Sequence, residues 1–134
     1  MSRLQLALTV SDVDEAVTFY ERMFATPVAK RRPGYANFAI ADPPLKLVLF
    51  ENGAGGTINH LGVETETAGE VTAAEARITD SGLETTGVDD TVCCYAEKTE
   101  TWIDGPDGTR WEWYVKNADV DQLEHESKTS TCCT

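Results

Sequence analysis

The stretch Thr57-Ile58-Asn59-His60-Leu61-Gly62-Val63-Glu64 decides the fold, because it repeats the design of the earlier segment Leu4 to Val10. Both segments alternate between two kinds of side chain, which predicts two β-strands. Gln5 occupies in the first strand the position that His60 occupies in the second, on the face that looks away from the main apolar layer. A polar residue repeated at one register predicts that both strands line a shared cavity.

A helix-start pattern follows each of these strands. Ser11-Asp12-Val13-Asp14 and Thr67-Ala68-Gly69-Glu70 both resemble capping boxes, and apolar residues then recur at helical spacing. We expect the first helix to end before Pro27 and the second to end near Gly82. Because the two boxes are displaced by almost the same number of residues as the two strands, the sequence predicts a duplicated unit.

Strand-like segments follow each predicted helix, at residues 28–31, 35–41 and 45–51 and again at residues 92–96, 100–103 and 110–115. The sequence thus predicts an α+β fold of two modules, at about residues 1–52 and 57–117. In each module a strand and a helix precede further strands, which number two or three in the first module. We expect these modules to form one domain over residues 1–117. Residues 118–134 are polar and predict a mobile tail.

Composition excludes several classes of partner. The chain has 134 residues and a net charge of -12, which repels nucleic acid and anionic membrane surfaces. No apolar run is long enough to span a bilayer, and no basic and apolar leader stands at the N-terminus. We therefore expect a cytoplasmic protein.

The four cysteines form two adjacent pairs, Cys93-Cys94 and Cys132-Cys133, and this spacing favours reduced thiols. If Cys93 and Cys94 lie on a regular strand, they point to opposite faces, and one of them is an ordinary core residue. A loop-like segment at residues 88–91 would instead let both thiols turn toward the cavity. We expect Cys132 and Cys133 in the tail to be inert or auxiliary, because a tail offers no preorganised geometry.

The duplicated unit resembles the glyoxalase, bleomycin-resistance and extradiol dioxygenase superfamily from Arg3 to Lys116. The resemblance implies two modules with the order strand, helix and three strands (βαβββ), which form an open eight-stranded cup around a metal, with ligands from the first and last strands of each module. These positions correspond to Gln5, His60 and Glu112. The fourth position falls near Lys46 or Val48, where the carboxylate of glyoxalases is missing, so a three-residue site is implied.

Each of these residues also has a simpler explanation. A single strand histidine is often a hydrogen-bonded structural residue, Glu112 between two tryptophans is often exposed to solvent, and Gln5 would fit a sheet edge. Their matched places in a duplicated fold favour the metal site. Fe(II) is the expected metal, and Mn(II), Ni(II) or Zn(II) would replace it in vitro.

A closer resemblance rests on residues 33–40, 44–49 and 59–64 and on Cys93-Cys94-Tyr95, which are similar to the arsenic- and cadmium-inducible branch of this superfamily. It implies an Fe(II)-dependent dioxygenase that uses O2 to cleave the carbon-arsenic bond of trivalent methyl- or aryl-arsenicals and releases arsenite. Cys93 and Cys94 would bind the arsenic. Proteins of this superfamily are often dimers, so we expect a homodimer.

Other functions remain to be separated from this one. A thiol pair on the same fold would also suit a protein that binds arsenic or cadmium for resistance without catalysis. Glyoxalase-type isomerisation is disfavoured because Lys46 and Val48 replace the general base. Extradiol ring cleavage is disfavoured because the cup has no further histidines for acid-base chemistry.

Overall fold

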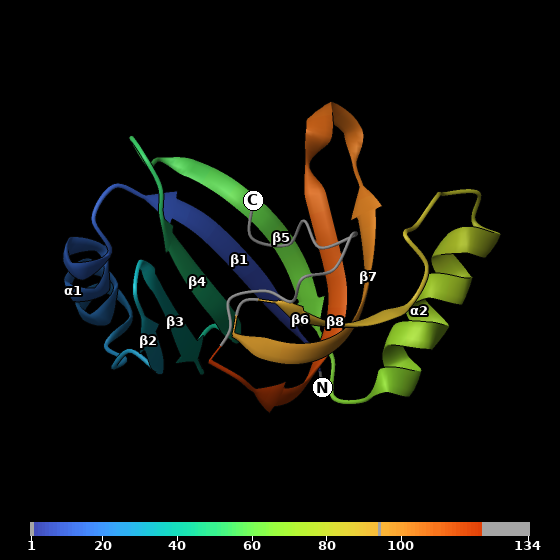
Figure 1. Ribbon diagram of the computed structural model, residues 1–134, viewed down its shortest axis with the longest axis horizontal. Coiled ribbons are helices and arrows are strands. Elements are labelled where there is room, and N and C mark those ends of the chain that lie inside the picture. Colours follow the sequence, from blue (N-terminus) through green and yellow to red (C-terminus); the bar gives the residue numbers. More distant parts are fainter. Residues whose placement is uncertain (1, 94, 122–134) are drawn as a thin grey trace. The chain divides into compact units, whose positions relative to one another are not determined.

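The computed structural model describes residues 2–93 and 95–121, apart from the side chain of Cys93 (Figure 1). The described chain divides into an N-terminal unit, Arg3–Leu61, and a C-terminal unit that begins at Gly62. In the described residues eight strands and two helices follow one another as two βαβββ modules. The predicted α+β fold class is therefore confirmed.

The N-terminal unit contains the first module and the beginning of the next strand. Its elements are β1 (Arg3–Val10), α1 (Val13–Phe24), β2 (Lys30–Arg32), β3 (Tyr35–Ile40), β4 (Leu45–Glu51) and the first part of β5 (Thr57–Glu64). The strands are hydrogen-bonded in the order β2-β3-β4-β1-β5, and β1 runs parallel to β4. This order brings β1 and β5, which carry the repeated pattern, side by side.

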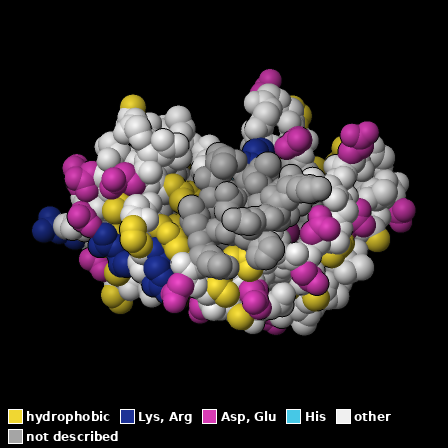
Figure 2. All heavy atoms as spheres, in the orientation of Figure 1, with side chains coloured by type: hydrophobic (Ala, Val, Ile, Leu, Met, Phe, Trp, Pro, Cys, Tyr) yellow, Lys and Arg dark blue, Asp and Glu magenta, His cyan; other side chains and the backbone are white. Residues whose placement is uncertain are grey.

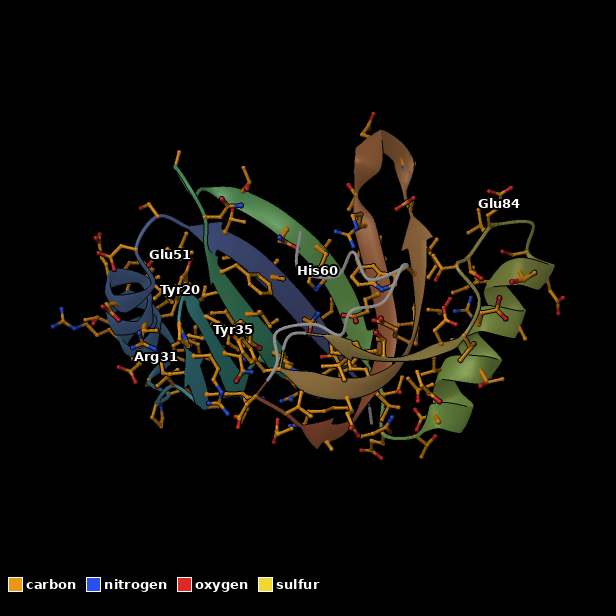
Figure 3. The ribbon with its side chains drawn as sticks, viewed as in Figure 1. Tyr20, Arg31, Tyr35, Glu51, His60 and Glu84 are labelled. Carbon is orange, nitrogen blue, oxygen red and sulfur yellow. The ribbon has the colours of Figure 1, made fainter. Side chains whose placement is uncertain are left out.

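One face of this sheet packs against α1 and forms the core of the N-terminal unit. Val13 and Val17 of the helix contact inward residues of the central strands, including Phe38, Leu47 and Leu49. Glu51 at the end of β4 accepts a hydrogen bond from the backbone N–H of Val13 at 2.9 Å, which ties the start of the helix to the sheet. Figure 3 shows Glu51 beside this end of α1.

The C-terminal unit contains the end of β5, α2 (Ala68–Asp80), β6 (Asp89–Cys93), β7 (Ala96–Asp104), the short 3-10 helix η1 (Pro106–Gly108) and β8 (Arg110–Asp119). Its strands are hydrogen-bonded in the order β5-β8-β7-β6. Helix α2 buries Val71, Ala74 and Ile78 and packs on β7 and β8. The predicted turn at residues 105–108 connects β7 to β8, and Asp107 in it has a φ of 63°.

The first helix begins one residue later than the predicted capping box. Its N-cap is Asp12, which accepts a hydrogen bond from the backbone N–H of Glu15 at 3.1 Å. The second cap is Thr67, as expected, and it accepts from the N–H of Glu70 at 3.1 Å. Thr67 lies as far after Asp12 as His60 lies after Gln5, a separation of 55 residues. The duplication is thus exact in its caps as well as in its strands.

Three strands of the C-terminal unit have boundaries that differ from those expected. Strand β6 begins at Asp89, so residues 89–91 are not a loop, and it ends at Cys93 rather than at Ala96. Strand β7 runs from Ala96, several residues before the expected start. Strand β8 continues to Asp119 because its last residues pair with the beginning of β7. Residues 122–134, with His125, Cys132 and Cys133, lie outside the described residues.

The position of the first cap is testable by substitution. We expect Asp12→Ala to lower the free energy of unfolding by about 1 kcal/mol, because it removes the acceptor for the Glu15 N–H. Ser11→Ala is the control and should change it by less than about 0.5 kcal/mol. Urea unfolding followed by circular dichroism measures both values. If Ser11→Ala lowered the free energy of unfolding more than Asp12→Ala, Ser11 would be the N-cap, as the sequence pattern predicted.

Candidate functional site

Gln5 and His60 meet at the centre of the N-terminal unit. The Nε2 atoms of the two side chains are 2.9 Å apart, and each side chain is only 1% exposed. Figure 3 labels His60 on β5, and the ring of Phe50 on β4 packs beside its ring at a centroid distance of 6.5 Å. The structure therefore brings together the two register-related residues that the sequence singled out.

The separation of these two atoms suits a metal ion. Two ligand atoms at right angles on a metal, with bonds of about 2.1 Å, lie about 3.0 Å apart. An imidazole nitrogen and an amide oxygen are donors of the kind that Fe(II) and Mn(II) accept. In this structure the Gln5 amide presents its nitrogen to His60, and a half-turn of the amide would present the oxygen instead. Gln5 and His60 can thus supply two adjacent ligands.

A third side chain contacts the other nitrogen of the His60 ring. Asn59 Oδ1 lies 2.7 Å from His60 Nδ1. Since the amide oxygen can only accept, the proton of a neutral ring lies on Nδ1, and Nε2 keeps its lone pair. The sequence pattern had assigned Asn59 to the opposite face of the strand, so this contact was missed.

Glu112 lies on β8 in the C-terminal unit and is fully buried, at 0% exposure. Its Oε2 accepts a hydrogen bond from Nζ of Lys98 on β7 at 3.1 Å, and the side chain of Lys98 is 1% exposed. The Lys98 ammonium also lies 4.5 Å from the centre of the Tyr114 ring. A carboxylate is not left buried without a compensating charge, and Lys98 supplies that charge here. The alternative explanation, that Glu112 is exposed to solvent, is therefore excluded.

Glu100 is the second buried carboxyl group of the C-terminal unit. Burial above all, together with the hydrogen bond to Glu112 and the negative charge of that residue, raises the pKa of Glu100 to about 10, although Lys98 and Trp102 act in the opposite direction. Its Oε2 is buried and has no hydrogen-bond partner. Glu100 is therefore a neutral, proton-bearing acid beside the ionic pair of Lys98 and Glu112. The alternating polar residues of β7 are the only sequence signal for Lys98 and Glu100, and that signal is weak.

The backbone of Cys93 lies at the end of β6, beside the start of β7. Cys93 pairs with Ala96, Thr91 pairs with Lys98, and Asp89 pairs with Glu100. The Cys93 backbone thus lies two residue pairs along the ladder from Lys98. Cys94 lies outside the described residues, and Tyr95 after it has a φ of 61°.

Lys46 and Val48 of β4 lie near the expected fourth ligand position, and both are buried. Lys46 pairs with Gln5 across β1 and β4. Arg77 of α2 lies 5.7 Å from the centre of the Trp113 ring. Within residues 2–93 and 95–121 no three His, Cys, Asp or Glu side chains cluster closely enough to form a metal site by themselves.

The fold and the matching family model define the class of protein. The model of the glyoxalase, bleomycin resistance protein and dioxygenase superfamily matches residues 3–113, and the chain belongs to this family. Methylmalonyl-CoA epimerase of Streptomyces coelicolor shares the fold, with a TM-score of 0.56 and 20% identity over 85% of this chain and 96% of the epimerase.

Two relatives are much more similar in sequence. A trivalent organoarsenical cleaving enzyme of Thermomonospora curvata is 51% identical over 137 residues, which cover 100% of this chain and 89% of the relative. Cadmium-induced protein CadI of Mycobacterium tuberculosis is 51% identical over 142 residues, which cover 99% of this chain and 93% of CadI. The similarity to both relatives spans essentially the full chain.

The raised pKa of Glu100 predicts how stability depends on pH. Between the ordinary carboxyl pKa of 4.5 and about 10, the folded protein holds a proton that the unfolded chain has lost. The unfolded state then binds fewer protons, so the free energy of unfolding of the metal-free protein should fall as pH rises through this window. Glu100→Gln should flatten that fall. Equal urea midpoint shifts in wild type and variant between about pH 6 and pH 9 would contradict a neutral Glu100.

Proposed function

We propose that this protein is a non-haem Fe(II)-dependent dioxygenase that cleaves the carbon-arsenic bond of trivalent organoarsenicals and releases arsenite. The observation that carries the proposal is the full-length 51% identity to the organoarsenical cleaving enzyme of Thermomonospora curvata. The buried contact of Gln5 with His60 supports it, because both side chains are of a type that binds metals and because burying polar groups costs free energy that an apolar pair would not cost. The cellular role would be detoxification in the cytoplasm.

We assign the metal to Gln5 through Oε1, His60 through Nε2 and Glu112 through its carboxylate. The chemistry that bound Fe(II) would supply here is the activation of dioxygen next to the carbon that is bonded to arsenic. The donor set is one neutral imidazole, one amide oxygen and one carboxylate, which leaves coordination positions for dioxygen and substrate. Lys46, which pairs with Gln5, has no oxygen in its side chain that could act as a fourth ligand.

We assign the arsenic to Cys93 and Cys94. A trivalent organoarsenical has two hydroxyl groups, and condensation with two thiols forms two sulfur-arsenic bonds and releases two water molecules. Two fixed sulfur atoms orient the carbon-arsenic bond and make its oxidation effectively unimolecular. The backbone of Cys93 pairs with Ala96, two residues before Lys98 on β7. Pentavalent arsenicals have no such thiol exchange and should be poor substrates.

The reaction balances for a methyl substituent. Methylarsonous acid, CH3As(OH)2, and one O2 give arsenous acid, As(OH)3, and formaldehyde, CH2O, with the same atoms on both sides. The methyl carbon is oxidised, dioxygen is reduced, and no other reductant is needed. Lys98 compensates the negative charge of Glu112, and neutral Glu100 adds no further negative charge to this buried group.

Arsenite release tests the proposal. Anaerobically purified full-length protein is loaded with Fe(II), mixed with a trivalent methylarsenical and exposed to oxygen, and arsenite is followed by chromatography with elemental detection. We expect release that needs both iron and oxygen. Arsenical binding without arsenite release, in protein shown to retain iron, would contradict the enzymatic function.

The thiol assignment has its own test. We expect Cys93→Ser and Cys94→Ser each to lower the rate of arsenite release by at least about 100-fold, because a single thiol leaves the arsenic free to rotate. Iron content should stay that of the wild type. Cys132→Ser with Cys133→Ser is the matched control and should keep its activity, as should a chain that ends at Asp121. Full activity of either single variant would exclude the two-thiol mechanism.

A second candidate function is thiol-based binding of arsenic or cadmium without turnover. The similarity to a protein named cadmium-induced protein CadI favours this function. The acidic side chains on the face shown in Figure 2 disfavour nucleic acid and other polyanions as ligands in either case. Oxygen uptake separates the two functions: an enzyme consumes about one dioxygen for each arsenite, as the balance above requires, whereas a binding protein consumes none.

We also expect a homodimer in solution, and light scattering of the purified protein measures its molar mass.

A further inference from the structure

We infer that Asn59 is a positioning residue that sets the tautomer of His60 and thereby makes Nε2 the metal-binding atom. The inference rests on the metal site proposed above and concerns a residue that takes no part in coordination. The observation behind it is the hydrogen bond of 2.7 Å between Asn59 Oδ1 and His60 Nδ1.

The hydrogen bonds around the ring are mutually consistent. Asn59 Oδ1 accepts from the Nδ1–H group, so the proton is held on that nitrogen. On the other side of the ring, the Gln5 amide nitrogen lies 2.9 Å from Nε2 and donates to its lone pair. A divalent metal needs that same lone pair. The metal-free protein therefore holds His60 in the tautomer that metal binding requires, and binding costs no proton transfer on the ring.

The duplication explains why only one module needs such a residue. Position 4 of β1 corresponds to position 59 of β5, and it is Leu4, an exposed apolar residue. Gln5 on β1 is an amide, which has no tautomers and turns to present either end. His60 on β5 is an imidazole, whose two nitrogens exchange roles unless a neighbour selects one. The polar side chain thus stands beside the ligand that needs orientation.

Loss of Asn59 would allow the opposite arrangement. Without an acceptor at Nδ1, the proton can move to Nε2, and Gln5 can turn its oxygen to accept it. Both groups remain hydrogen-bonded in that state, but the lone pair at Nε2 is gone. Asn59→Leu therefore creates a metal-free state in which the Nε2 position is blocked. Since a partner of a ligating histidine changes metal affinity by about 10- to 100-fold, the variant should bind Mn(II) and Zn(II) that much more weakly.

The experiment uses nitrogen NMR of the full-length, metal-free protein near pH 8, where histidine is neutral. The chain has 2 histidines, so His125→Gln assigns the His60 signals. Wild type should show a protonated Nδ1 and an unprotonated Nε2. Asn59→Leu should shift the equilibrium toward Nε2–H, and Asn59→Asp, which keeps an acceptor, should restore the wild-type pattern. Competition titrations with Mn(II) and Zn(II) on the same samples give the affinities.

The control is Asn37→Leu, a half-buried asparagine of the same unit that donates a hydrogen bond to Tyr35 Oη at 2.9 Å and not to His60. It should change neither the tautomer nor the metal affinity. An Nε2–H tautomer in wild type would overturn the inference even if Asn59→Leu failed to fold. Wild-type tautomer and affinity in folded Asn59→Leu would overturn it as well. Neither readout involves an arsenical, so failure of the proposed cleavage reaction is recognised separately.

Discussion

The contact between Gln5 and His60 is the constraint on which the site depends. Two strands that begin duplicated modules lie next to each other, and their equivalent polar residues meet at 2.9 Å in a fully buried position. Buried polar groups are tolerated only when they are satisfied, so this contact fixes the register of β1 against β5 as well as the direction of the His60 ring. The fold and the ligand geometry of this unit therefore have the same cause.

Charge in the C-terminal unit is organised around a comparable constraint. Lys98, Glu100 and Glu112 are all buried, and they are stable together because one cation faces one carboxylate while the other carboxyl group keeps its proton. A carboxylate arranged in this way is ionised but has no excess of negative charge around it. Such a ligand would hold a divalent cation without the strong attraction of an acidic cluster, which fits a metal that must exchange and react.

Much of this organisation could be predicted from the sequence. Alternating and helical periodicity predicted both modules, and the equivalent positions of Gln5 and His60 predicted that these two side chains lie close together. The capping residue was misplaced because Ser11 and Asp12 are both good N-caps, and only the hydrogen bond to Glu15 distinguishes them. Lys98 and Glu112 lie on neighbouring strands but are not register partners, since Lys98 pairs with Lys116 and Glu112 with Trp102, so no local sequence pattern predicts their contact. The role of Asn59 was hidden because strand alternation assigns neighbouring residues to opposite faces, whereas a side-chain oxygen can reach the ring of the next residue.

The central claim is that Gln5, His60 and Glu112 bind one metal ion. Anomalous diffraction at the iron edge, from crystals grown with Fe(II) without oxygen, tests it most directly. The account predicts one strong peak bonded to Gln5 Oε1, His60 Nε2 and a carboxylate oxygen of Glu112. A peak at other residues, or iron-loaded crystals in which these three side chains bind no metal, would contradict it.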